Sequence, residues 1–108
     1  LFRRALTNLL QNAIQHSRPG SRVLVRIAGD ERSAAVSVSN PSAPIAPEQL
    51  PRLFDRFYRV DSSRRNSGEN HGLGLSIVKA VAVMHNGTVF ARSDNGITTV
   101  GFSVALKA

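Results

Sequence analysis

The stretch "LFRRALTNLLQNAIQHS", residues 1–17, decides one layer of the fold, because its apolar side chains have the spacing of an amphipathic helix. Apolar residues recur in an i, i+3, i+4, i+7, i+8 pattern, which predicts a helix over residues 1–16. The expected core stripe is Leu6, Leu9, Leu10, Ala13 and Ile14. A helix with one apolar stripe must pack on another element, so the chain needs a second layer.

Asn8, Asn12 and Gln15 share a face roughly opposite that stripe. Asparagine is a weak helix former, so something other than helix stability is needed to account for the pair. One interpretation is a solvated polar face, which is expected opposite any core stripe. The other is functional, because an amide oxygen is a hard ligand of the kind that Mg²⁺ prefers.

The rest of the chain predicts two hairpins and a second helix. Strands are expected at 22–28 and 34–40, and again at 88–93 and 98–106, from alternating apolar residues around turn signals. The second helix is expected from Gly72, with an apolar side of Leu75, Ile77, Val78, Val81, Ala82 and Met84 and a C-cap at Asn86-Gly87. A proline-rich segment with one helical turn at Pro47 to Leu50, and a long irregular loop at 55–71, separate the two halves.

This order predicts an α/β (α+β) two-layer sandwich with a mostly antiparallel mixed sheet and both helices on one face. The outer face of the sheet should be polar, as Arg26, Ser37, Ser39 and Ser103 indicate.

Composition narrows the function classes. The 108 residues form one domain, and the absence of cysteine excludes disulfides and thiolate metal sites. The formal net charge of +7 favours polyanionic partners such as nucleotides, nucleic acid or acidic surfaces. No apolar run is long enough to span a membrane, and no signal peptide is evident.

Two further segments carry chemistry. In "HGLGLSI", Gly72 and Gly74 begin a helix, where free N–H groups favour phosphate; the pattern is neither a Walker A nor a dinucleotide motif. Arginines 52, 56, 59, 64 and 65 surround Phe54, Phe57 and Tyr58, a combination that fits a nucleotide or single-stranded nucleic acid. Burial of Leu53, Phe54 and Phe57 would also anchor that loop.

The four segments, in this order, resemble the ATP-binding catalytic domain (HATPase_c, GHKL superfamily, Bergerat fold) of two-component sensor histidine kinases. "LTNLLQNAIQHS" resembles the N box, "NPSAPIAP" occupies the place of the G1 box, "LPRLFDRFYRVD" resembles the F box and "HGLGLSIVK" the G2 box. The Asn-Pro variant of G1 and the F-box region are similar to those of heavy-metal (copper, silver, cobalt-zinc-cadmium) sensors. The resemblance implies one catalytic domain over residues 1–108, truncated at its N-terminus and lacking the dimerisation and sensor regions.

The resemblance also implies the site. Asn12 would be the Mg²⁺ ligand and Asn8 its companion beside the triphosphate. ATP-hydrolysing branches have glutamate at the position of Asn8, and an amide cannot act as a general base, so the site is suited to holding ATP. Arg59 is the expected phosphoryl-stabilising residue, with Arg56 second. The remaining expected ATP contacts are Gln15, His16, Asn40, Ile45, Leu53, Tyr58, His71, Gly72, Leu73, Gly74 and Leu75.

Five residues depart from the family pattern, and one of them is His16, which replaces an aromatic residue often found beside the nucleotide. Asn40 replaces the G1 aspartate and no glycine follows it, although its Oδ1 can still accept from the adenine amino group. Asn70 and His71 replace the start of G2. Gln15 replaces a frequent basic residue.

The implied activity is transfer of the γ-phosphoryl group of Mg-ATP to a histidine of the kinase's own dimerisation domain, and from there to a response-regulator aspartate. None of the three histidines here has the context of a phosphoacceptor. The resemblance implies a homodimeric full-length sensor at the bacterial inner membrane. This fragment is expected to be a monomeric cytoplasmic domain without nucleic-acid or direct membrane contacts, under a lid of residues 58–71.

Two alternatives remain open. One is an ATPase of the gyrase or chaperone kind, which Asn8 and the F box disfavour. The other is a degenerate nucleotide-binding or basic nucleic-acid-binding scaffold without kinase activity, which the +7 charge and the altered G1 and G2 segments favour.

Overall fold

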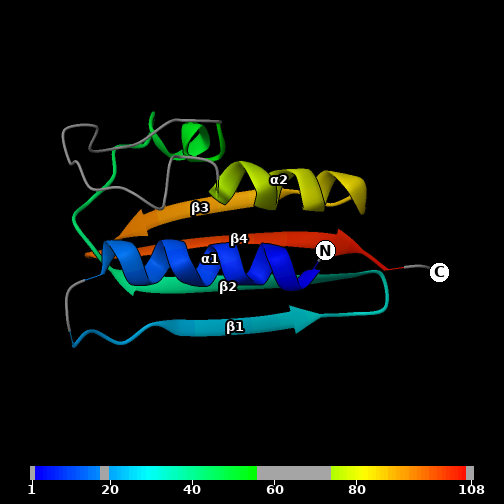
Figure 1. Cartoon of the computed structure of the whole chain (residues 1–108), viewed down its shortest axis with the longest axis horizontal. Helices are drawn as coiled ribbons and strands as arrows, with labels where there is room; N and C mark the ends of the chain where they lie inside the picture. The colour runs from blue at the N-terminus through cyan, green and yellow to red at the C-terminus, as the bar shows by residue number, and fades with distance from the viewer. Residues whose placement is uncertain (1, 18–19, 56–73, 107–108) are drawn as a thin grey trace.

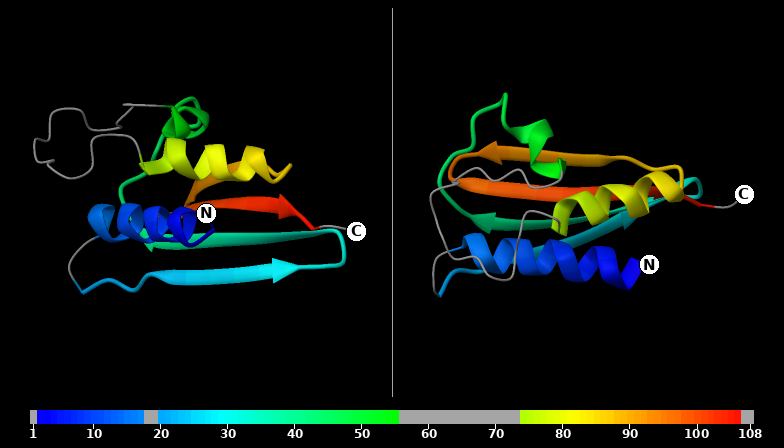
Figure 2. Two further views of the ribbon diagram at one scale, coloured as in Figure 1. Left: turned by 45° about the vertical axis from the view of Figure 1, so that its right-hand side comes forward. Right: turned by 45° about the horizontal axis from the view of Figure 1, so that its top comes forward.

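The computed structural model describes residues 2–17, 20–55 and 74–106 (Figure 1). In these ranges, helices lie on one face of a four-stranded sheet, as the two further views in Figure 2 show. The predicted two-layer sandwich is confirmed. The elements in chain order are α1 (Phe2–His16), β1 (Leu24–Gly29), β2 (Ser33–Pro41), η1 (Leu50–Phe54), α2 (Gly74–Met84), β3 (Val89–Asp94) and β4 (Ile97–Ala105).

The sheet has the strand order β1-β2-β4-β3, and every neighbouring pair is antiparallel. Both predicted hairpins are therefore confirmed, and the β2–β4 pair joins them across the middle of the sheet. In that pair Val38 lies opposite Val100 on the helix side, while Ser37 and Ser39 lie on the outer side. The predicted polar outer face is only partly correct. Arg26, Ser37, Ser39 and Ser103 lie on it, but residues alternate between faces along each strand, and the same face also carries Leu24, Phe90 and Ile97.

The core lies between the sheet and the two helices. Leu9 of α1 and Val78 of α2 are 1% and 0% exposed, and both pack with Val38 and Phe102 of the sheet. Burying side chains of this size contributes roughly 1.5–3 kcal/mol each. The helices also contact one another, so α1 touches both the sheet and α2.

The predicted core stripe of α1 is partly wrong. The fully buried residues are Ala5, Leu9 and Ala13, whereas Ile14 is 64% exposed. Asn8 and Asn12 are half-buried. At 100° per residue, the two asparagines lie beside the buried row of Ala5, Leu9 and Ala13 and not opposite it. The second helix α2 also contacts α1. The asparagines therefore do not form the solvated face that the simple pattern suggests.

The second helix also departs from the prediction at one residue. Met84 is 64% exposed, because it lies about 120° around the helix from Val78 at the centre of the buried side. The C-cap is confirmed. Asn86 has a φ of 59°, and the N–H of Gly87 donates to the carbonyl oxygen of Ala82 at 2.7 Å.

The short helical turn begins later than expected. A hydrogen-bonded turn occupies 47–49, and the 3₁₀ helix η1 follows at Leu50–Phe54. Pro51 fits the first turn of η1, where no N–H is required. The shift places Phe54 in the core at 5% exposed, as expected for an anchoring residue.

The β1–β2 turn is closed by Asp30. Its Oδ1 accepts hydrogen bonds from the N–H groups of Arg32 at 2.8 Å and Ser33 at 3.0 Å. These backbone donors, that of Ser33 first, lower the pKa of the Asp30 carboxyl. Because the folded-state pKa is depressed, this stabilisation is present above the unfolded-state pKa and is lost as the pH falls through the folded-state value.

Candidate nucleotide-binding site

The described parts of the four motifs converge on one end of the sandwich. The C-terminal half of α1, the C-terminal end of β2 and the N-terminal end of α2 lie toward the left of Figure 1, and η1 contacts α2. Asn12, Asn40, Leu53 and Gly74 belong to these four elements. Segments far apart in the sequence thus supply one shared edge, which is the arrangement that a binding site requires.

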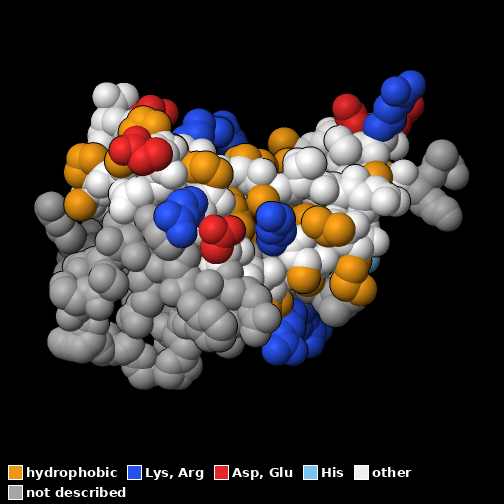
Figure 3. All heavy atoms as spheres, turned by 90° about the horizontal axis from the view of Figure 1, so that it is seen from above, with side chains coloured by type: hydrophobic (Ala, Val, Ile, Leu, Met, Phe, Trp, Pro, Cys, Tyr) orange, Lys and Arg blue, Asp and Glu red, His pale blue; other side chains and the backbone are white. Residues whose placement is uncertain are grey.

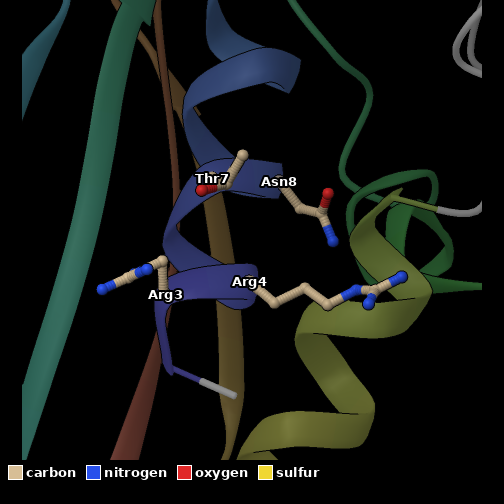
Figure 4. A pocket seen from close by; sticks show the side chains of 4 residues that line it. All are labelled: Arg3, Arg4, Thr7 and Asn8. Carbon is tan, nitrogen blue, oxygen red and sulfur yellow. The ribbon is translucent and has the colours of Figure 1, made fainter.

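Asn8 lies on the side of α1 that faces α2, and Asn12 follows it one helical turn later on the same face. The Nδ2 atom of Asn8 is buried and has no hydrogen-bond partner among the described residues. Figure 4 shows its side chain extending toward α2. A buried amide donor without an acceptor costs about 1–3 kcal/mol, so the position is not explained by stability.

Asn40 is 4% exposed and lies on the helix side of the sheet, two residues after Val38. Its Nδ2 donates to the carbonyl oxygen of Pro41 at 3.1 Å. This bond orients the amide and leaves Oδ1 as the acceptor that a ligand can use. Thr98 pairs with Asn40 in the β2–β4 register and is 6% exposed.

Thr98 is a candidate that the sequence reading missed. The alternation of side chains along a strand could have identified it. Thr98 is separated by an even number of residues from Val100, Phe102 and Val104, so it faces the helices as they do. Thr98 lies beside Asn40 because β2 pairs with β4. The sequence did not predict this strand pairing.

The proline-rich segment after β2 is fastened to the β3–β4 hairpin. The N–H of Ser42 donates to the carbonyl oxygen of Gly96 at 2.9 Å, and the hydroxyls of Ser42 and Thr98 are hydrogen-bonded. The N–H of Ile45 donates to Oγ of Ser93 at 3.0 Å. These bonds hold the half-buried Ile45 in place without the glycines of the usual G1 box.

Four predicted contacts have different environments. A Cβ added to Gly74, at the N-terminus of α2, would meet no described atom within 4 Å. Leu75 is 8% exposed and packs in the core, so only its backbone is free to contact a ligand. Leu53 is half-buried beside that core, and Gln15 lies exposed on α1.

The other predicted site residues lie outside the part of the chain that the structure describes, as does the predicted lid at 58–71. They are Arg56, Tyr58, Arg59, His71, Gly72 and Leu73, together with the side chain of His16.

The described residues contain no preformed metal site. No group of three or more His, Cys, Asp or Glu side chains within 2–17, 20–55 and 74–106 could hold a metal ion. Neither α1 nor α2 contains an acidic residue. A Mg²⁺ ion at Asn12 would therefore take most of its ligands from nucleotide phosphates and water, which is a common mode for this ion.

The fold and these motifs define a nucleotide-binding domain of the GHKL type. The chain belongs to the family described as histidine kinase-, DNA gyrase B- and HSP90-like ATPase, which matches residues 1–108. It is 53% identical over 94 residues to the sensor histidine kinase CusS of Escherichia coli K12, covering 87% of this chain and 20% of that protein. It is 47% identical over 94 residues to the probable sensor kinase SilS of Salmonella typhimurium, covering 87% of this chain and 19% of that protein.

Among solved structures, the mycobacterial sensor histidine kinase MprB matches with a TM-score of 0.82 and 32% identity, over 94% of this chain and 70% of that one. The predicted resemblance to the catalytic domain of sensor histidine kinases is confirmed. The chain spans about a fifth of the length of the curated relatives it matches. No helix within the described ranges is long and apolar enough to cross a bilayer.

Proposed function

We propose that this domain binds Mg-ATP at the shared end of α1, β2 and α2 and donates the γ-phosphoryl group to a histidine of the dimerisation domain of its own sensor kinase. The observation that carries the proposal is the convergence of three segments on one end of the fold: the C-terminal half of α1, the C-terminal end of β2 and the N-terminal end of α2. These segments contain Asn12, Asn40 and Gly74. Phosphoryl transfer depends chiefly on positioning and charge neutralisation, and these residues can supply positioning.

Each residue has a separate task in this proposal. Asn12 gives an amide oxygen to Mg²⁺, which when bound neutralises charge on the β- and γ-phosphates. Asn40 accepts from the adenine amino group, and Gly74 lets the phosphates approach the N-terminal N–H groups of α2. Asn8 has no basic function at neutral pH, so it does not activate water and the γ-phosphoryl group is kept for a protein acceptor.

The biological setting is part of the same proposal. The relatives CusS and SilS support a place in the heavy-metal sensor subgroup of two-component systems. The partners would be the phosphoacceptor helix of the same homodimeric sensor, held at the bacterial inner membrane, and then a response regulator. Residues 1–108 would act as its cytoplasmic catalytic domain, with Arg59 and Arg56 stabilising the phosphoryl group in transfer.

Calorimetric titration of the chain with ATP and ADP, with and without Mg²⁺, tests this function. We expect ATP binding that Mg²⁺ strengthens, and no binding of Mg²⁺ alone, since the described residues hold no carboxylate cluster. Loss of any Mg²⁺ effect, or preferential binding of single-stranded oligonucleotide with a steep salt dependence, would instead favour the scaffold alternative.

Gly74→Ala separates packing from ligand binding. Because a Cβ here meets no described atom within 4 Å, and alanine is the better helix former, the variant should be as stable as the wild type or slightly more so. Its affinity for ATP should nevertheless fall, by about tenfold for about 1.4 kcal/mol of lost phosphate contact. Thermal unfolding and ATP titration measure the two effects. Unchanged ATP affinity would remove Gly74 from the site.

Asn40 is expected to select the base. Its Nδ2 is already bonded to the carbonyl oxygen of Pro41, which leaves the acceptor Oδ1 for the base. A purine with a 6-keto oxygen would bring two acceptors together there. Inosine triphosphate should bind about tenfold or more weakly than ATP, since an unmatched buried acceptor costs about 1–3 kcal/mol. Asn40→Asp, which keeps an acceptor, should preserve the preference for ATP, and Asn40→Ala should weaken it. Equal binding of both nucleotides by the wild type would contradict the assignment.

A further inference from the structure

The chain contains the dipeptide Asn-Gly twice, at Asn86-Gly87 and at Asn95-Gly96. In each pair the asparagine has a positive φ, 59° at Asn86 and 50° at Asn95. An asparagine followed by glycine is open to attack on its side chain by the backbone, because glycine has no Cβ to shield the attacking nitrogen. The two pairs are identical in composition but differ in their surroundings, so their reactivities should differ.

Asn86-Gly87 is bonded and packed. The N–H of Gly87 donates to the carbonyl oxygen of Ala82 at 2.7 Å, and the N–H of Asn86 donates to that of Val83 at 3.0 Å. Gly87 also lies against β4, where an added Cβ would overlap the carbonyl oxygen of Ser103. The nitrogen that would attack is therefore already bonded, and moving it would disturb both the C-cap of α2 and the packing on β4.

Asn95-Gly96 is the exposed turn between β3 and β4, at the left of Figure 1. The φ values of 50° at Asn95 and 78° at Gly96 are those of a type I′ hairpin turn. No described residue accepts a hydrogen bond from the N–H of Gly96, and an added Cβ would meet no described atom within 4 Å. Attack requires rotation of the Asn95 backbone, which an exposed loop tip permits at a low free energy of opening.

We infer that Asn95 is a site of spontaneous deamidation. The backbone nitrogen of Gly96 attacks Cγ of Asn95, so that an N–Cγ bond forms and the Cγ–Nδ2 bond breaks. The side-chain NH₂ leaves as ammonia, together with the proton of the Gly96 N–H. Water then opens the resulting five-membered succinimide at either of its carbonyl carbons, which gives aspartate or isoaspartate at position 95.

The isoaspartyl product changes the turn that fastens the segment after β2. It places an extra carbon atom in the main chain, and a two-residue hairpin turn cannot contain it without disturbing the pairing of Asp94 with Ile97. The carbonyl oxygen of Gly96 accepts from the N–H of Ser42 at 2.9 Å, so the modification should loosen this bond. An effect on ATP rests on the proposed function, because Asn40 lies two residues before Ser42.

Incubation of the chain at mildly alkaline pH, followed by peptide mapping with mass spectrometry, tests the site. Attack requires a deprotonated amide nitrogen, so the rate should rise with pH. We expect isoaspartate to form at least about tenfold faster at position 95 than at position 86, because the bonds at Gly87 must first break. Equal or faster modification at position 86, or none at position 95, would overturn the inference.

Two variants test the link to the segment after β2. Asn95→Gly removes the reactive amide and keeps a residue that favours the turn. Asn86→Gly is the matched control, since glycine suits the C-cap. After the same incubation, hydrogen exchange at the Ser42 N–H should be faster in the wild type and in Asn86→Gly, and unchanged in Asn95→Gly. Unchanged exchange at Ser42 in the isoaspartyl form would overturn this link.

ATP titration before and after incubation separates the modification from the proposed function. The fresh wild type should bind ATP, and the incubated wild type should bind it more weakly in proportion to its isoaspartyl fraction, whereas Asn95→Gly should keep its affinity. Equal affinity in the isoaspartyl form would overturn the effect on the nucleotide site. A fresh chain that binds no ATP would overturn the proposed function and leave the modification site at Asn95 intact.

Discussion

Replacing Asn12 with alanine is expected to remove most of the Mg²⁺-dependent part of ATP binding. Asn12 lies half-buried on the α2 side of α1, and the described residues contain no carboxylate cluster that could take over the metal. Losing a ligand from such a sparse site should weaken Mg-ATP binding by roughly tenfold to a hundredfold, the range seen for groups that support metal sites. Calorimetry with and without Mg²⁺ measures this directly.

Gln11→Ala is the matched control for that experiment. Gln11 is the exposed neighbour of Asn12 on the same helix, so its removal should leave ATP affinity unchanged. Alanine is favourable in a helix, and neither variant should unfold the domain. A full Mg²⁺ effect in Asn12→Ala would show that the metal is held elsewhere.

Gly87→Ala is expected to have the largest effect on stability. A Cβ at Gly87 would lie 1.7 Å from the carbonyl oxygen of Ser103 and 2.8 Å from Cα of Val104. Both are backbone atoms of β4, so they cannot move without disturbing the bond from the N–H of Ser103 to the carbonyl oxygen of Thr88 at 2.8 Å. Overpacking costs about 1–3 kcal/mol where side chains can adjust, and more is expected here.

Chemical denaturation of Gly87→Ala and the wild type measures this cost. Gly74→Ala serves as the control, because the same added methyl group meets open space there. A loss below about 1 kcal/mol in Gly87→Ala would mean that the α2–β3 connection can move away from β4, contrary to the packing described.

The periodicity of the sequence was sufficient to predict the layers of this fold. Alternation and turn signals located both hairpins, and the stripe containing Leu9 and Ala13 located α1. The pattern erred at Ile14 and Met84, because hydrophobicity reveals that a helix has a buried side but not which neighbour covers each flank. The second helix covers the asparagine side of α1, and only the tertiary structure shows this.

The candidate site was predictable where a residue's role depends on its own chemistry, and less so where it depends on a partner. Asn8 and Asn12 stood out as amides in a helix, whereas Asn40 was indicated by the place of the G1 box in the family resemblance. Thr98 did not, since a threonine in a strand is ordinary until the β2–β4 register places it next to Asn40. The bond from Asn40 to Pro41 likewise required coordinates.

The places where the first and last described residues are held have a practical consequence for labelling experiments. Phe2 stacks against His85 with ring centroids 4.7 Å apart, and the N–H of Leu106 donates to the carbonyl oxygen of Arg32 at 2.7 Å. Both contacts lie at the end of the sandwich opposite the G1 and G2 segments (Figure 1). Figure 3 shows the molecule from above, where hydrophobic side chains lie among the charged ones on the described surface. A fluorophore or surface tether attached at either terminus should therefore leave the nucleotide end open to solution.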